Sequence, residues 1–337
     1  MRAYIEINGN ALENNYLAIK KETGKDVIAV IKSNAYGHGL IECARILAKN
    51  KVPMFAVATI EEAIAIRKSL IFTPIILLGP CLDYRILSSY KITALILGET
   101  YLQKLLKSPY PIQVHIMLDL GMNREGIALD QLDNVIERIH KSKLQLKGIC
   151  THYSSLANYE VVHETFHQLQ TKYASMHLVF HSSATSTYLS NHDDNHFFRI
   201  GLALYGLDEK HTPVLSLKAP IIRKKFVQQG EKVGYDEMGV VAKDGYIYTI
   251  GLGYADGWPR DYPTSAYLGD IQLQQIGRTC MDYLMLFSKE NIDENSILTI
   301  IGEKKTVQMI AEEQNTIPYE ITTRFSMRLK RKTIYIK

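Results

Sequence analysis

The sequence predicts an α/β protein in which an N-terminal (β/α)8 barrel of the TIM type is followed by a mostly β C-terminal domain. The first observation is that eight apolar runs alternate with amphipathic helical segments between Asp26 and Leu207. This alternation favours a closed barrel over an open doubly wound sheet. The second observation is that helical periodicity fades after Leu207, where short strand-like runs and turns follow. We therefore expect the two domains at residues 1–212 and 213–337.

The predicted elements follow one another in the order that a barrel requires. The barrel strands are apolar and rich in β-branched residues, as strands buried on both faces are. We expect them at residues 27–32, 54–59, 74–79, 91–97, 112–118, 146–151, 177–181 and 199–205. The clearest helical patterns lie at residues 8–21, 41–49, 60–69, 129–141 and 160–174. In the second domain we expect strands at residues 221–227, 246–252, 271–275, 283–287, 297–301 and 333–336.

Composition and charge exclude several classes of function. The net charge of +4 is small, and we interpret the densest basic run, residues 324–332, as a solvated face and not a nucleic-acid surface. The four cysteines lie far apart without a Cys-x-x-Cys pair, which argues against a zinc finger and a disulfide framework. The sequence shows neither a signal peptide nor a stretch of transmembrane length. We expect a cytoplasmic protein with no membrane and no nucleic-acid partner.

Lys32 is the most informative residue. It ends the first predicted strand, and a glycine-containing turn with Gly37 and Gly39 follows. An amine that is partly buried at the mouth of a barrel loses proton affinity. The free amine can then attack a carbonyl and form a Schiff base. The alternative is a lysine whose side chain extends from the strand end into solvent.

Polar residues also stand at the carboxyl ends of other predicted strands, where barrel enzymes carry their chemistry. Arg124 follows the fifth strand, His152 follows the sixth, and residues 181–183 close the seventh. Arg199 opens the eighth, with Gly201 two residues further on. Arginines, hydroxyls and glycine amides on one rim suit an anionic, phosphate-bearing ligand beside the amine of Lys32.

A competing motif lies in the predicted helix at residues 160–174. His163, Glu164 and His167 match the pattern H-E-x-x-H, which on a helix can hold zinc with the glutamate as a base. This would make the protein a zinc protease. We expect instead that both histidines lie on the polar face of an amphipathic helix, because no third ligand is evident.

Several motifs, in order along nearly the whole chain, resemble those of a known family. The most specific are the lysine signature at residues 29–39, the Gly-Tyr-Ala-Asp-Gly element at residues 253–257 and the Cys-Met-Asp element at residues 280–282. Others lie at residues 120–126, 151–153, 181–184, 198–206 and 233–235. The chain resembles the bacterial alanine racemases, which use pyridoxal 5′-phosphate (PLP). The resemblance implies a barrel followed by a β domain, in agreement with the pattern of elements.

The resemblance also implies roles for individual residues. Lys32 would hold PLP covalently and act as one acid/base, and Tyr235 from the second subunit of a homodimer would act on the opposite face. The other cofactor-binding residues would be Tyr36, Ser183, Gly201 and Leu202 at the phosphate, Arg199 at the pyridine nitrogen and His152 beside Arg199. The substrate carboxylate would be bound by Arg124 and the backbone of Met281, and Tyr254 and Asp282 would line the path by which substrate enters.

The chain departs from the family pattern at three positions. Met117 stands where many relatives carry a lysine, often carbamylated, that braces the residue matching Arg124. Met327 stands where well-known relatives have a tyrosine near the cofactor phosphate. Asp236 follows Tyr235 where glycine is common. We expect these changes to bear on the choice of substrate more than on the type of reaction.

We therefore expect a homodimeric, PLP-dependent racemase that interconverts L- and D-alanine for peptidoglycan. The first alternative is the same reaction on another small amino acid such as serine, in a pocket altered at Met327. The second is a non-catalytic barrel that binds PLP, although such proteins lack the β domain that carries Tyr235. No metal is expected.

Overall fold

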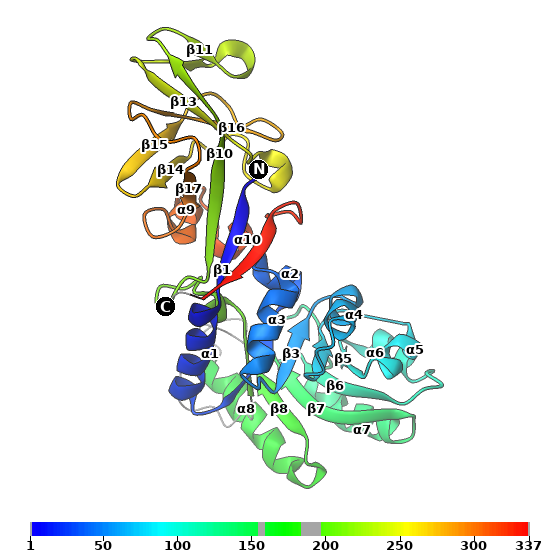
Figure 1. Ribbon diagram of the computed structural model, residues 1–337. Helices are drawn as coiled ribbons and strands as arrows, with labels where there is room; N and C mark the ends of the chain where they lie inside the picture. The colour runs from blue at the N-terminus through cyan, green and yellow to red at the C-terminus, as the bar shows by residue number, and fades with distance from the viewer. Residues whose placement is uncertain (1, 154–158, 183–196, 336–337) are drawn as a thin grey trace. The chain divides into compact units, whose positions relative to one another are not determined.

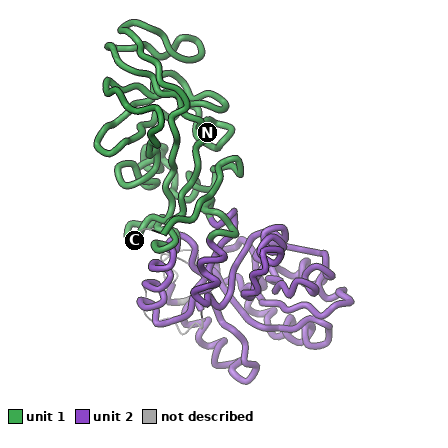
Figure 2. The backbone as a smooth tube through the Cα atoms, in the orientation of Figure 1, with its two compact units in different colours: residues 1–11, 36–42, 205–337 green, residues 12–35, 43–204 purple. Residues whose placement is uncertain are grey.

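The computed structural model describes residues 2–153, 159–182 and 197–335, without the side chain of residue 161. The chain forms two compact units, shown in different colours in Figure 2. We call them the barrel unit (residues 12–35 and 43–204) and the sheet unit (residues 1–11, 36–42 and 205–337). Within the described ranges, no helix combines the length and the hydrophobicity needed to cross a bilayer.

The barrel unit is built on a closed parallel sheet of the strands β2 to β9 in sequence order, so the predicted fold class is confirmed. The sheet closes because β9 pairs with β2. Its strands are almost entirely buried, which explains their continuous apolar runs. They are β2 (Asp26–Val30), β3 (Met54–Val57), β4 (Ile75–Leu77), β5 (Ile92–Ile96), β6 (Ile112–Leu118), β7 (Leu144–Thr151), β8 (Val179–Ser182) and β9 (Phe197–Ile200).

Amphipathic helices lie outside this barrel (Figure 1). In α7 (Leu132–His140) the buried residues are Leu132, Val135, Ile136 and Ile139, the spacing of a single helix face. The other helices between the strands are α3 (Leu40–Lys49), α4 (Ile60–Lys68), α5 (Tyr84–Ser89), α6 (Glu99–Leu105) and α8 (Tyr159–Lys172), and α1 (Gly9–Thr23) precedes β2.

The prediction of a strand at residues 199–205 was wrong for the second half of that range. Strand β9 ends at Ile200, and the 3-10 helix η3 (Leu202–Tyr205) follows Gly201. A short apolar run has the same appearance in a buried strand and in a buried helical turn, so its periodicity could not separate the two. Arg199 therefore lies inside β9 and does not open it.

The sheet unit contains an antiparallel sheet in the order β13-β16-β15-β14-β17-β10-β1-β18. Strand β1 (Tyr4–Asn8) was not predicted; it pairs with β10 (Leu215–Val227) and, in parallel, with β18 (Lys330–Ile334). The predicted limits were confirmed for β15 (Ile271–Gln275) and β17 (Ile297–Ile301). The remaining strands are β13 (Gly245–Ile250), β14 (Ser265–Leu268) and β16 (Leu284–Ser288), with the small pair β11 (Lys232–Val233) and β12 (Gly239–Val240) and the helices α9 (Val307–Glu313) and α10 (Pro318–Thr323).

Candidate active site

Lys32 lies two residues beyond the end of β2, at the carboxyl mouth of the barrel. It begins the short segment α2 (Lys32–Tyr36), in which Ser33, Asn34, Ala35 and Tyr36 all have φ between 52° and 56°. A left-handed backbone conformation costs about 1–2 kcal/mol for each residue that carries a Cβ. Four such residues in succession persist only where neighbouring groups fix them, and strain of this kind is typical of functional sites.

The carboxylate of Glu62 is one of the groups that fix this turn. One oxygen accepts a hydrogen bond from the Asn34 amide at 3.0 Å, and the other accepts from the Ala58 amide at 2.9 Å. Glu62 also forms a capping box with Thr59 at the start of α4. It therefore ties the turn after Lys32 to the neighbouring βα connection.

The amine of Lys32 is partly buried among charged groups. Burial lowers its pKa, and the positive charge of Arg124 lowers it further. The carboxylates of Glu125 and Glu62 act in the opposite direction. The free amine is therefore easier to form here than on a solvated lysine, as the nucleophile in a carbonyl condensation requires.

Arg124 follows β6 on an exposed loop and pairs with the next residue. Its Nη2 lies 2.6 Å from Oε1 of Glu125. Asp119 shapes the same loop by accepting hydrogen bonds from the amides of Gly121 and Asn123. Met117 is buried, with its sulfur 3.9 Å from Sγ of Cys150. The anionic partner of Arg124 is thus Glu125, whereas Met117 belongs to the barrel core.

Arg199 is only 5% exposed, and its guanidinium is held from several sides. Nη2 donates to the carbonyl of Thr151 at 2.7 Å, and Nη1 lies 2.5 Å from Nδ1 of His181. His181 Nε2 lies 2.7 Å from Nδ1 of His115. Burial and the charge of Arg199 lower the pKa of His115 to about 3 and that of His181 well below its usual range. Both imidazoles are therefore neutral.

The other predicted residues of the barrel unit lie near this group. His152 follows β7 and is half-buried, and burial and the charges of Arg199, Arg124 and Lys32 lower its pKa to about 4. Gly201 is buried and Leu202 begins η3. Ser183 lies outside the described residues. The barrel thus brings Lys32, Arg124, His152 and Arg199 to one rim.

The remaining predicted residues belong to the sheet unit. Tyr36 packs against the rings of Tyr205 and Tyr319, at centroid distances of 5.2 and 6.4 Å. Burial raises its pKa to about 12. Tyr235 begins the 3-10 turn η4 (Tyr235–Glu237) and is 70% exposed. Asp236 has φ 56°, a conformation in which glycine is favoured.

Tyr254, Met281 and Asp282 lie together in the sheet unit. The amide of Tyr254 donates to the carbonyl of Cys280, and the amide of Ala255 donates to that of Met281, both at 3.1 Å. Tyr254 begins the turn η5 (Tyr254–Asp256). The carboxylates of this region are paired: Asp256 with Arg2, and Asp282 with Arg328. This arrangement fixes the loop that presents the Met281 backbone.

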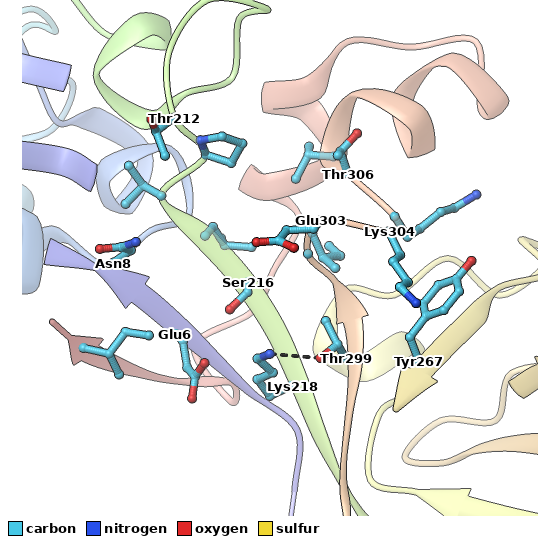
Figure 3. Close-up of a pocket in the computed structure, with 18 of the residues that line it drawn as sticks. Glu6, Asn8, Thr212, Ser216, Lys218, Tyr267, Thr299, Glu303, Lys304 and Thr306 are labelled. Atoms are coloured by element: carbon cyan, nitrogen blue, oxygen red, sulfur yellow. Dashed lines mark hydrogen bonds between the residues drawn. The ribbon is translucent and has the colours of Figure 1, made fainter. Parts of the chain in front are cut away.

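Two other places in the protein do not form a comparable site. His163 stacks on Tyr159 at a centroid distance of 5.6 Å, and the described residues include no group of three His, Cys, Asp or Glu side chains suited to a metal. A groove of about 620 Å³ lies in the sheet unit beside β10 and β17 (Figure 3). Its lysines are engaged: Lys218 with Thr299, Lys304 with Asp270 and Lys305 with Glu313.

Three residues that contact the predicted site residues or their partners were missed from the sequence. Glu62 carried a signal, because Thr59 and Glu62 have the spacing of a capping box. Glu125 stands directly after Arg124, but the ion pair depends on how the loop folds. His115 carried no signal, since a single histidine inside an apolar strand does not reveal which residues it faces.

Fold and site together define a class of protein: a parallel barrel joined to an antiparallel β domain, with a partly buried amine among arginines at the barrel mouth. Two family models match the chain, the alanine racemase N-terminal domain over residues 7–209 and the C-terminal domain over residues 214–333. The solved structure of alanine racemase from Clostridium difficile 630 superimposes with a TM-score of 0.91 at 27% identity, covering 99% of this chain and 96% of the other.

Curated relatives agree with this match. The alanine racemase of Ligilactobacillus salivarius is 32% identical, covering 93% of this chain and 92% of that protein. An amino-acid racemase of Enterococcus faecalis is also 32% identical over 97% of this chain, which spans about half (51%) of that protein. The chain belongs to the alanine racemase family.

Proposed function

We propose that the protein is a PLP-dependent racemase that interconverts L- and D-alanine and supplies D-alanine for peptidoglycan. The observation that carries the proposal is the partly buried amine of Lys32, whose pKa is lowered at a barrel mouth that also holds Arg124 and Arg199. A primary amine of this kind suits covalent attachment of an aldehyde. The family and its alanine racemases support the choice of reaction and substrate.

The chemistry of the donor set fits PLP. The aldehyde of PLP requires an amine, and its phosphate requires amide or hydroxyl donors. Its phenolate oxygen suits a cation, and its pyridine nitrogen suits a hydrogen-bond donor that leaves the ring neutral. In this chain Lys32 would hold the aldehyde carbon, and Arg199 would donate to the ring nitrogen beside His152. The phosphate would be bound by Tyr36, Ser183, Gly201 and Leu202. When bound, PLP withdraws electrons from the substrate Cα and makes its proton acidic.

The protein's own residues would then remove the Cα proton from one face of the substrate and return a proton to the other face. Lys32 removes or returns a proton at Cα on one face, and Tyr235 does so on the opposite face. Arg124 and the Met281 backbone hold the substrate carboxylate, and Tyr254 and Asp282 line the approach. Because a guanidinium only donates hydrogen bonds, Arg199 leaves the ring nitrogen unprotonated, which limits side reactions such as transamination.

We propose that the working form is a homodimer in the cytoplasm and that each site takes Tyr235 from the partner subunit. The exposure of Tyr235 supports this assignment, as do the neighbouring exposed side chains of Met238 and Val240. Exposed apolar residues grouped in this way are typical of surfaces that a second protein covers.

A chiral assay tests the function. Purified protein with added PLP is incubated separately with L-alanine and D-alanine, and the enantiomers are separated by chromatography. We expect both reactions to reach equal amounts of the two enantiomers. An absence of interconversion in protein that binds PLP would point to the non-catalytic barrel.

A racemase of another small amino acid, such as serine, is the second candidate. It is favoured by the similarity to an amino-acid racemase and by Met327, which is 77% exposed and offers no hydroxyl group. Initial rates over a panel of amino acids separate the candidates. A kcat/KM for serine above that for alanine would replace alanine as the proposed substrate.

A further inference from the structure

The buried histidines beside Arg199 have only one arrangement of protons that satisfies their contacts. A guanidinium has donors and no acceptor, so Nδ1 of His181 must accept from Nη1 of Arg199. The proton of neutral His181 is therefore on Nε2. Since Nε2 lies 2.7 Å from Nδ1 of His115, it donates there, and His115 carries its own proton on Nε2.

The barrel is built to allow this contact. His115 lies in β6 and His181 in β8, on either side of β7 (Figure 1). The residue of β7 opposite His115 is Gly148, and a Cβ there would lie 2.9 Å from Nδ1 of His115. The pairing of β6 and β7 also shifts between Val114 and His115. An irregularity of this kind in a strand pair changes the direction of a side chain.

We propose that His115 is a positioning residue: it accepts the Nε2 proton of His181, holds that imidazole in place, and through it holds the guanidinium of Arg199 at the barrel mouth. Burial supports the mechanism, since His115 is 1% exposed and His181 is fully buried, so water is not a ready substitute for either partner. The effect on catalysis rests on the proposed function, whereas the assignment of the His181 and His115 protons to their ring nitrogens does not.

Two substitutions separate positioning from simple filling of the core. In His115→Asn, the side-chain oxygen takes the place of Nδ1 and can still accept from His181. In His115→Leu, a side chain of similar volume removes the acceptor. A merely structural role would make both variants less stable and leave His181 unchanged.

The first measurement uses the full chain with ¹⁵N-labelled histidine, before and after addition of PLP, and assigns the His181 signals by their loss in His181→Asn. We expect the Nε2–H tautomer in all three proteins, with the downfield Nε2 proton of a strong hydrogen bond in the wild type and in His115→Asn and the loss of that downfield shift in His115→Leu. An Nδ1–H tautomer in the wild type overturns the inference, and this measurement requires no folded His115 variant.

The second measurement is kinetic. We expect kcat of His115→Leu to fall about tenfold at saturating PLP, in line with an unsatisfied buried donor, with KM for alanine within twofold of the wild type. His115→Asn should recover most of kcat. Equal kcat values and an unchanged Nε2 proton shift of His181 in both variants would reject the role of His115. A protein with no racemase activity at all would reject the proposed function but leave the tautomer result intact.

Discussion

At the scale of the residue, the proposed function depends on one amine. Burial and the charge of Arg124 both disfavour the ammonium form of Lys32, which favours the free amine that the proposed role requires. In Lys32→Ala we expect loss of the borohydride-reducible absorption near the visible edge and a fall in racemisation of at least about a thousandfold, because a covalent anchor and an acid/base are removed together. Spectroscopy and the chiral assay check both. A variant that kept the reducible band would rule out Lys32 as the anchor.

Glu125 opposes the effect of Arg124 on the same amine. Its negative charge stabilises the ammonium and so raises the pKa of Lys32. In Glu125→Gln we expect that pKa to fall, so that the free amine predominates from a lower pH. The pH dependence of the rate at which PLP reacts with cofactor-free protein measures this, and its midpoint should move to lower pH. Glu125→Asp, which keeps the charge, is the control; a midpoint unchanged in Glu125→Gln would contradict the electrostatic argument.

Tyr235 is assigned to one face of the substrate only. In Tyr235→Phe we expect solvent deuterium to enter alanine on one face much more slowly, by about a hundredfold or more, since a general base is lost. Exchange started from L-alanine and from D-alanine measures the two faces separately. Tyr110→Phe, another exposed tyrosine, serves as the control. Equal slowing from both enantiomers would count against two bases.

At the scale of the element, the turn after Lys32 depends on contacts distant in sequence. Glu62 accepts from the amides of Asn34 and Ala58, and an amide side chain cannot replace both acceptors. In Glu62→Gln we expect a loss of about 1–3 kcal/mol in the free energy of unfolding and a lower Tm. Calorimetry on Glu62→Gln and on Glu61→Gln, its exposed neighbour, tests this. The proposed role of Glu62 in the turn is wrong if the two variants have the same Tm.

Elements also differed in how far they could be predicted. β15 and β17 were predicted to the residue, because each is a short strand-like run next to turn residues that mark its limits. Strand β1 was missed, although its burial alternates, because its partners β10 and β18 lie more than 200 residues away in the sequence. The helix η3 was taken for strand because its apolar residues are buried in either form.

At the scale of the whole molecule, the proposed sharing of Tyr235 makes activity depend on assembly. We expect activity per subunit to fall as the protein is diluted below the dissociation constant of the homodimer. Light scattering and racemisation measured over the same concentrations check this. Monomers that retain full activity would exclude a base donated by the partner subunit. The domain limits at residue 212 likewise remain a prediction, which expression of the separate domains can examine.

The sequence by itself determined the barrel followed by a β domain and the family, and it pointed to Lys32 as the candidate central residue. These follow from periodicity and from motifs that are local along the chain. Only the tertiary structure decided that Glu125 is the partner of Arg124, that Glu62 holds the left-handed turn, and that His115 reaches His181 across Gly148. The physical reason is that hydrogen bonds and charge interactions depend on distance in space, and closure of the barrel brings together residues that the chain keeps far apart.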